Sequence, residues 1–203
     1  MPQITLYEHA PTRSARCRWT LLEAGLAYES VGFGGQAGLA ELRAVHPLGK
    51  LPVAIIDGRP LFESAAIATA IADLSPERDL IAKPGSWSRA LHDQWVSFAL
   101  TEMEPWLWSS EINSVDVLMP KERQVPAIIE QNNALFRRSA AVLDAVLGES
   151  HYLVEDRFTV TDIIVGYTVS WGADDGLLGG FGNLQSYLDR LHEREHCTLP
   201  RPG

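Results

Sequence analysis

The chain has 203 residues, of which 46% are hydrophobic and 21% charged, a composition typical of a soluble globular protein with one large domain or two small ones. Its net charge of −9 argues against a general nucleic-acid-binding protein, which needs a basic surface. Two cysteines are too few for a disulfide framework, and we find neither a signal-peptide pattern nor an apolar run of membrane-spanning length. We therefore expect a cytoplasmic protein that binds neither nucleic acid nor membrane.

The first part of the chain alternates the patterns of strands and helices. Residues 4–7 are typical of a short buried strand, a helical pattern follows and ends at Gly25, and residues 28–33 alternate as a second strand. Two strands joined by a helix over so short a distance are expected to be parallel. A glycine-rich loop and a short irregular helix over residues 38–45 follow.

The next segment predicts a β-hairpin and then a helix. Two short apolar runs, 53–56 and 61–62, flank Asp57 and Gly58, a strong signal for a tight turn between antiparallel strands. Residues 65–74 have the pattern of a helix. The element order up to this point, βαβαββα, predicts a thioredoxin-like α/β domain.

Both ends of this hairpin are predicted to offer polar backbone to a ligand. Pro52 stands at the mouth of a strand, a position that favours a cis peptide bond after Leu51. Such a bond leaves the amide and carbonyl of Leu51 unpaired. Ser64 opens the helix after the hairpin, and the N-terminus of a helix provides free amides and partial positive charge that suit a carboxylate.

Strand patterns disappear in the second part of the chain. We predict a thioredoxin-like domain over residues 1–75, a proline-containing linker over residues 76–86, and an all-helical domain, a bundle, over residues 87–203. The fold class is therefore α/β followed by all-α.

Two long helical patterns stand out in the helical domain, over residues 87–104 and 121–147. Pro105 is expected to kink or break the first of them. The second carries two apolar stripes with a period of seven residues, which predict a wide buried face. The stripes are Ile128, Leu135 and Val142, and Ile129, Phe136 and Leu143.

A capping signal lies further along the helical domain. Thr159 can cap a helix with the acidic Asp162 three residues later, and Phe158 and Ile163 can form a hydrophobic staple around that cap. Any helix can start in this way, so the signal supports a fold and not an activity. A glycine-rich loop over residues 172–182 and an amphipathic helix over residues 184–194 follow.

Taken together, these motifs resemble those of a known family. Residues 49–53, the turn at Asp57-Gly58, and the pair Glu63-Ser64 at this spacing are similar to the glutathione-binding half of the cytosolic glutathione S-transferases, with a bacterial-like serine/threonine-type turn. The Thr-x-x-Asp box resembles the helix start in the second domain of that family. The resemblance covers nearly the whole chain.

The resemblance implies how the tripeptide glutathione would be held. The backbone of Leu51, before the cis Pro52, would pair with the cysteinyl part. Lys50 would pair with the glycyl carboxylate, Glu63 would take the α-amino group of the γ-glutamyl end, and Ser64 would take its carboxylate. If these residues do not bind glutathione, Lys50 is an ordinary solvated side chain, Glu63 is a strand-end carboxylate and Ser64 is a plain helix cap.

Conjugation requires a thiolate, and a free thiol with a pKa of about 8.5 is mostly protonated at neutral pH. A hydroxyl directed at the sulfur near a helix N-terminus lowers that pKa. Thr12 and Ser14 are equal candidates, because the serine of the family, counted back from Arg16, falls nearer Thr12, while Ser14 is the more natural helix cap. Cys17 is expected to face the core, and Tyr7 lies within the strand.

The second substrate would lie between the domains. Trp106, Trp108 and Tyr167 are aromatic candidates for an electrophile pocket, although aromatic residues at helical spacing are more often part of a core. His46 and Arg13 can each reach a carboxylate, and each also has an ordinary structural explanation. The six histidines lack the paired spacing of a metal site, and no phosphate-binding loop motif is present.

We therefore expect a homodimeric glutathione transferase that uses glutathione as co-substrate and no metal, and that attacks a small apolar electrophile with the glutathione thiolate. Two alternatives remain open at this point. One is another glutathione-dependent enzyme, such as an isomerase, lyase or dehalogenase. The other is a non-catalytic interaction protein that keeps the fold.

Overall fold

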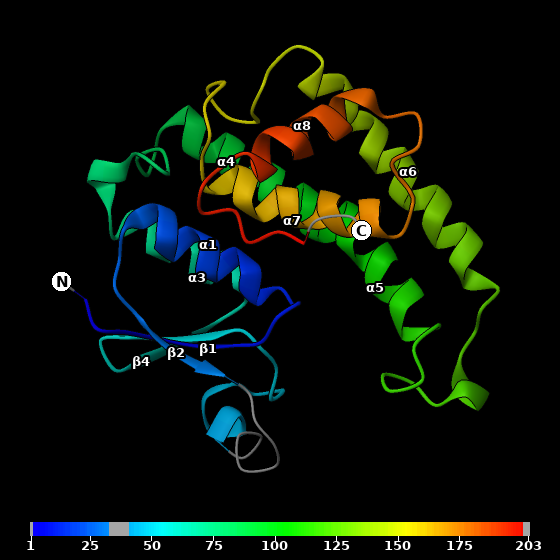
Figure 1. Cartoon of the computed structure of the whole chain (residues 1–203), viewed down its shortest axis with the longest axis horizontal. Helices are drawn as coiled ribbons and strands as arrows, with labels where there is room; N and C mark the ends of the chain where they lie inside the picture. Colours follow the sequence, from blue (N-terminus) through cyan, green and yellow to red (C-terminus); the bar gives the residue numbers. More distant parts are fainter. Residues whose placement is uncertain (1, 33–40, 201–203) are drawn as a thin grey trace.

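The computed structural model describes residues 2–32 and 41–200. A four-stranded sheet carries helices in the first part of the chain, and helices alone make up the rest (Figure 1). The expected fold class, an α/β thioredoxin-like part followed by an all-helical part, is confirmed.

The sheet has the strand order β2-β1-β3-β4. Its strands are β1 (Ile4–Glu8), β2 (Glu29–Gly32), β3 (Val53–Ile56) and β4 (Arg59–Phe62). β1 and β2 are parallel, as the strand–helix–strand pattern predicts, and the other two pairings are antiparallel. The second strand begins one residue later than predicted, and Phe33 lies outside the described residues.

Two helices cover the face of the sheet that looks toward the helical part, α1 (Ser14–Ala24) and α3 (Ser64–Asp73) (Figure 1). Gly25 ends α1 in the left-handed conformation, with φ of 65°, which glycine adopts without a steric penalty. Residues 41–45 are helical and lie on the opposite face of the sheet. The rest of the helix predicted over residues 38–45 lies outside the described residues.

The helical part begins with a pair of helices that run on continuously through a π-helical turn. That turn falls at residues 99–103, so the irregularity lies just before Pro105 and not at it. Pro105 sits in the first turn of the next helix, where its missing N–H is tolerated. The helical elements are η1 (Pro76–Arg78), α4 (Trp87–Phe98), η2 (Ala99–Met103), α5 (Glu104–Ile112), η3 (Lys121–Arg123), α6 (Ile128–Leu147), α7 (Val160–Asp174) and α8 (Gly182–His192).

The structure corrects two predictions for these helices. The pattern over residues 121–147 is a 3-10 turn followed by α6, and only one of its two stripes is buried: Phe136 and Leu143 lie in the core, whereas Val142 is 46% exposed. The buried face is completed by small and polar residues such as Ser139 and Ala140, which a search for apolar periodicity does not detect. The loop predicted from Gly172 is still helical there, because α7 continues to its last residue, Asp174.

The capping box at the start of α7 is confirmed. Thr159 and Asp162 exchange their hydrogen bonds, and Asp162 also accepts from the amide of Leu153 and the hydroxyl of Tyr187, at 3.1 and 3.0 Å. Complete burial raises the pKa of Asp162 to about 6, although all of these donors favour its charged form. The carboxylate thus fixes α7, α8 and the preceding loop to one another.

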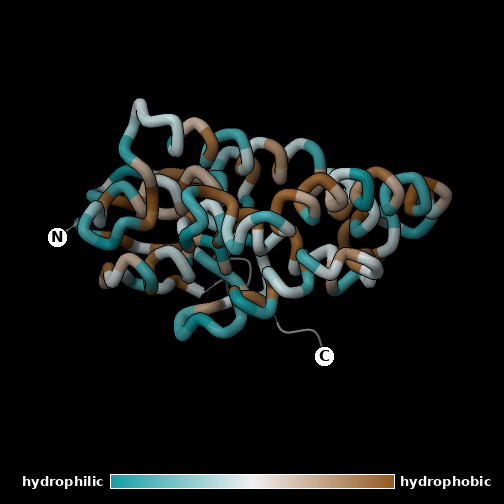
Figure 2. Tube along the Cα trace, turned by 90° about the horizontal axis from the view of Figure 1, so that it is seen from above, coloured by the Kyte–Doolittle hydropathy of each residue, from teal (hydrophilic) through white to brown (hydrophobic). Residues whose placement is uncertain are grey.

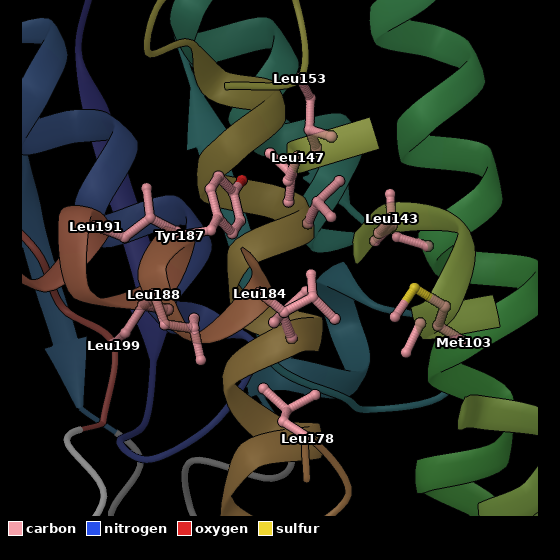
Figure 3. Packing of buried hydrophobic residues seen from close by; sticks show 14 of the residues in the cluster. Met103, Leu143, Leu147, Leu153, Leu178, Leu184, Tyr187, Leu188, Leu191 and Leu199 are labelled. Carbon is pink, nitrogen blue, oxygen red and sulfur yellow. The ribbon is translucent and has the colours of Figure 1, made fainter. Parts of the chain in front are cut away.

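Apolar side chains form two packed clusters, one under the sheet helices and one within the helical part. Figure 3 shows the second, where Leu184, Tyr187, Leu188 and Leu191 of α8 pack with residues of the neighbouring helices. The clusters interlock, since Trp19 of α1 belongs to the helical cluster. Conversely, Val160 and Ile164 of α7 belong to the sheet cluster.

Apolar and polar residues alternate along the helices (Figure 2). Among the described residues, no helix combines the length and the apolar character that crossing a membrane requires.

Candidate functional site between the sheet and the helices

One edge of the sheet gathers the three predicted motifs. Val53 at the start of β3 pairs with Tyr7 near the end of β1 on one side and with Phe62 at the end of β4 on the other. The turn after β1, the loop before β3 and the start of α3 therefore meet at this edge. Tyr7 and Val53, which lie 46 positions apart in the sequence, become neighbours through this strand register.

The loop before β3 contains the predicted cis peptide bond, between Leu51 and Pro52. The pairing of β3 begins only at Val53, so the backbone of Leu51 lies outside the ladder at the edge of the sheet. A second cis bond, Ala10–Pro11, lies in the turn after β1 and was not predicted.

Glu63 and Ser64 begin α3 with an unusual backbone. Glu63 has φ of 71°, a conformation that costs a residue with a side chain about 1–3 kcal/mol and is concentrated at functional sites. Its side chain is exposed, and it makes no side-chain cap for α3. Ser64 is the first residue of the helix and not its cap, and it is 5% exposed. Its hydroxyl accepts a hydrogen bond of 3.2 Å from Nη1 of Arg16.

Thr12 and Ser14 contact each other in the turn before α1. Their hydroxyl oxygens are 2.8 Å apart, and Ser14 also accepts from the amide of His9, at 3.2 Å. Thr12 is near enough to the carbonyl of His9 to donate to it instead. Ser14 is completely buried, and Arg13, not Ser14, occupies the capping position of α1. Thr12 is only partly buried and is therefore the more accessible hydroxyl.

A cavity of about 230 Å³ adjoins this turn. Thr12 and Arg18 line it from the first part of the chain, Tyr167 from α7, and Thr198 from the C-terminal segment. Thr198 holds that segment in place by donating to the carbonyl of Ala15, at 2.9 Å.

A buried ionic network links the two parts of the chain behind this edge. Arg16 of α1 is fully buried, and its guanidinium donates to Ile164 and Thr168 of α7 and to Glu104 of α5, at 3.0, 2.8 and 2.6 Å. Glu104 also accepts from Arg13. From the sequence, Arg16 served only as the position from which the family serine was counted back, and Glu104 was not identified. A buried carboxylate between helices leaves no periodic signal in a single sequence.

The charge of Glu104 is stabilised by its partners. Burial alone raises the pKa of this carboxyl, but the guanidiniums of Arg16 and Arg13 outweigh burial and lower it to about 2. Glu104 is therefore ionised at neutral pH, and two cations share one carboxylate.

Aromatic residues from the helical part face the two exposed cations of the site. Trp108 lies 5.2 Å from the guanidinium of Arg13 and 5.8 Å from the ammonium of Lys50, and Trp171 lies 5.0 Å from Arg13. Tyr167 covers the guanidinium of Arg16, at 4.8 Å. The sequence analysis named Trp108 and Tyr167 for this position and did not name Trp171.

Trp106 does not join this group. Its indole donates to the carbonyl of Glu102 within its own helix, and its ring packs against the helical core. A spacing of two residues places Trp106 and Trp108 on different faces of α5. Trp106 therefore stays a prediction for the electrophile pocket, and it is not among the rings that lie over Arg13 and Lys50.

The remaining candidates have structural roles. Cys17 is fully buried, and burial raises the pKa of its thiol, which disfavours the reactive thiolate. His46 accepts the amide of Leu48 on Nδ1, at 2.9 Å, and packs against Phe62. Tyr7 lies within β1. The described residues contain no group of three potential metal ligands.

The comparisons with known proteins agree with this geometry. Residues 2–73 match the family model described as "Glutathione S-transferase, N-terminal domain". The chain is therefore similar to the cytosolic glutathione S-transferases. It is 27% identical to glutathione S-transferase F10 of Arabidopsis thaliana over 93% of this chain and 87% of that protein. It is 25% identical to GstA of Escherichia coli O157:H7 over 94% and 89% of the respective chains.

Solved structures of this family share the whole fold. The glutathione transferase URE2P6 of Phanerochaete chrysosporium, in complex with oxidized glutathione, superposes with a TM-score of 0.82 at 27% identity, covering 96% of this chain and 93% of that one. Another relative is named not as a transferase but as elongation factor 1-gamma, from Prunus avium. It is 26% identical over 74% of this chain, which corresponds to 34% of that protein. These relatives come from plants, bacteria and fungi, and they do not assign a bacterial-like subtype.

Proposed function

We propose that this protein is a glutathione transferase that joins the glutathione thiolate to a small apolar electrophile. The observation that carries the proposal is the convergence, at one edge of the sheet, of the Leu51–Pro52 loop, the Glu63-Ser64 helix start and the turn at Thr12. Each contributes a different kind of group: unpaired backbone, a carboxylate beside a hydroxyl, and a hydroxyl next to a helix N-terminus.

Each part of glutathione has a counterpart at this edge. The backbone of Leu51 would pair with the cysteinyl unit, Lys50 with the glycyl carboxylate, Glu63 with the α-amino group and Ser64 with the γ-glutamyl carboxylate. Arg16 supports this assignment, because its hydrogen bond fixes the hydroxyl of Ser64 and its cationic charge lies behind the position of the carboxylate. The positive φ of Glu63 is consistent with a position selected for binding.

The chemistry requires the sulfur to lose its proton before it attacks. Thr12 is the hydroxyl that we assign to the sulfur, since Ser14 is buried and already accepts from His9 and Thr12. In this role Thr12 turns its single hydroxyl proton away from Ser14 and the carbonyl of His9 and donates it to the thiolate, and the hydroxyl of Ser14 then donates to the oxygen of Thr12 and orients it. The proton leaves to solvent, the thiolate forms a carbon–sulfur bond, and the leaving group of the electrophile departs with its bonding electrons.

The second substrate would bind beside Trp108 and Tyr167, on the side of the candidate site that the helical part forms. Holding it next to the thiolate provides the proximity that makes the bimolecular step effectively unimolecular. A cytoplasmic location and a homodimer, in which the first domain of one subunit lies against the second domain of the other, are part of the same proposal.

Calorimetric titration with glutathione tests the binding assignment. We expect Ser64→Ala to weaken binding roughly 10- to 100-fold, the effect of losing a hydrogen bond to a charged group. Glu63→Gln should weaken it in the same direction. Ser97→Ala, an exposed serine of α4, is the matched control and should bind as the wild type does. Unchanged affinity in Ser64→Ala and Glu63→Gln would refute the assignment.

A non-catalytic interaction role is the second candidate, and it is supported by the three relatives named elongation factor 1-gamma. In that case the protein would lack measurable conjugation of glutathione with any activated aromatic halide.

A glutathione-dependent isomerase, lyase or dehalogenase would bind glutathione equally well. Its product would distinguish it, because the carbon that bore the leaving group would not keep the glutathionyl group.

A further inference from the structure

Two aromatic rings and a carboxylate hold the guanidinium of Arg13 beside the start of α1. Its central carbon lies over the rings of Trp108 and Trp171, at 5.2 and 5.0 Å from the ring centroids. Its Nε donates to the buried carboxylate of Glu104. Two aromatic rings and one carboxylate thus fix a side chain that otherwise has several freely rotating bonds.

Arg13 keeps two donor groups unused. Its Nη1 and Nη2 have no hydrogen-bond partner among residues 2–32 and 41–200, and its side chain is 31% exposed. Arg16 differs in this respect, because its Nε, Nη1 and Nη2 all donate to buried partners. Of the two cations that share Glu104, Arg13 is therefore the one that has both free donors and solvent-exposed surface.

The cations around Arg13 outnumber the carboxylates, which favours the binding of an anion. Glu104 is its ion-pair partner, but this carboxylate is already shared with Arg16. Lys50 adds a further cation on the ring of Trp108. Glu111 is the other acidic residue that interacts electrostatically with Arg13. No salt bridge joins the two among the described residues, and burial raises the pKa of the Glu111 carboxyl. This local surplus of cations occurs in a chain with a net charge of −9.

We propose that Arg13 recognises an anionic group on the second substrate, so that the preferred electrophile is a flat conjugated molecule carrying a carboxylate or a similar anion. This inference rests on the proposed transferase function and adds the class of the electrophile. The anion would accept two parallel hydrogen bonds from Nη1 and Nη2, and the flat part would contact the edges of the Trp108 and Trp171 rings, whose faces the guanidinium covers. Arg13 directly follows Thr12 in the sequence, so an electrophile held by Arg13 would lie on the same turn as the hydroxyl assigned to the sulfur.

The binding test does not require catalysis. Calorimetry compares para-nitrobenzoate with para-nitrobenzamide, which have the same ring and differ in charge. We expect the wild type to prefer the anion by roughly 10-fold or more, as for a charge-assisted hydrogen-bonded pair, and Arg13→Met to lose that preference. Arg138→Met, an exposed arginine on α6, is the matched control and should retain it. Equal affinity of the wild type for both compounds would overturn the proposal.

The kinetic test uses a chlorodinitrobenzoate and the matching chlorodinitrobenzamide, each with chlorine para to the carbonyl group. In both, the carbon–sulfur bond replaces the carbon–chlorine bond and chloride leaves with the electron pair. We expect Arg13→Met to lower kcat/KM about 10-fold for the benzoate and little for the benzamide, with the KM for glutathione unchanged. A rise in that KM, with both electrophiles affected equally, would assign Arg13 to glutathione and refute the proposal.

The two proposals fail in distinguishable ways. If the protein selects the anionic ring in the calorimeter but conjugates neither chloro compound, the transferase function fails while the anion site stands. If it conjugates both chloro compounds equally well and binds both rings equally, the transferase function stands and the anion site fails.

Discussion

Glu104 carries a negative charge that is almost completely buried. It is 6% exposed, and its two cationic partners, Arg13 and Arg16, come from the start of α1, far away in the sequence. Removing one partner of a buried ion pair costs more than forming the pair gains, because the remaining charge is left without compensation. Arg16, which has no exposed surface, would be that remaining charge.

We predict that Glu104→Gln lowers the free energy of unfolding by about 3 kcal/mol at neutral pH. Glu102→Gln, an exposed glutamate two residues away, is the control and should change it by less than about 0.5 kcal/mol. Urea denaturation followed by circular dichroism measures both variants. A Glu104→Gln protein as stable as the wild type would show that the network contributes no net stability.

The pH dependence of this difference has a definite sign. The pKa of Glu104 in the folded protein, about 2, lies below its ordinary value of 4.5, so the stabilising contribution is present above pH 4.5. It is lost as the pH falls through about 2. The difference between wild type and Glu104→Gln should therefore shrink between pH 4.5 and 2. A difference that grows in this range would contradict the assignment of the charge.

At the level of elements, α7 is the helix on which the two parts of the protein meet. Its N-terminal residues Val160 and Ile164 pack into the sheet cluster, while Thr168 and Trp171 face the candidate site. The capping box sets where this helix begins and therefore which residues of α7 face the candidate site. A change at the cap is expected to affect stability and site geometry together.

Asp162→Asn tests the cap. The amide group would place N–H donors where the carboxylate now accepts from Thr159, Leu153 and Tyr187, and at least one donor would lose its partner. We expect a loss of about 2 kcal/mol in the free energy of unfolding at pH 7. Asp189→Asn on the exposed face of α8 is the matched control. Equal stability of Asp162→Asn and the wild type would show that the box is not required.

At the level of the whole molecule, local signals in the sequence were sufficient for most of the fold. The Asp57-Gly58 turn, the cis Pro52 and the Thr159 box are each defined by residues close together in the chain, and all are found in the structure. The alternation of strand and helix patterns gave the correct topology. Local conformational rules act over a few residues, so a single sequence carries them fully.

Most contacts between residues far apart in the chain could not be predicted from the sequence. Nothing local indicates that Arg13 and Arg16 share Glu104, or that Trp171 joins Trp108, since both depend on how α5 and α7 pack on α1. The choice between Thr12 and Ser14 also required burial, which composition cannot supply. The stripe containing Val142 was misjudged because apolar periodicity predicts a buried face only where another element covers it.

The most direct test of the proposed function is the thiol pKa of glutathione bound to the protein, measured from the ultraviolet absorbance of the thiolate as a function of pH. We predict a pKa clearly below the value of about 8.5 for an unperturbed thiol. Thr12→Val should return it toward that value and Thr12→Ser should not, with glutathione affinity retained in both variants. A bound thiol that titrates as it does in free solution would contradict the proposal that this site activates glutathione.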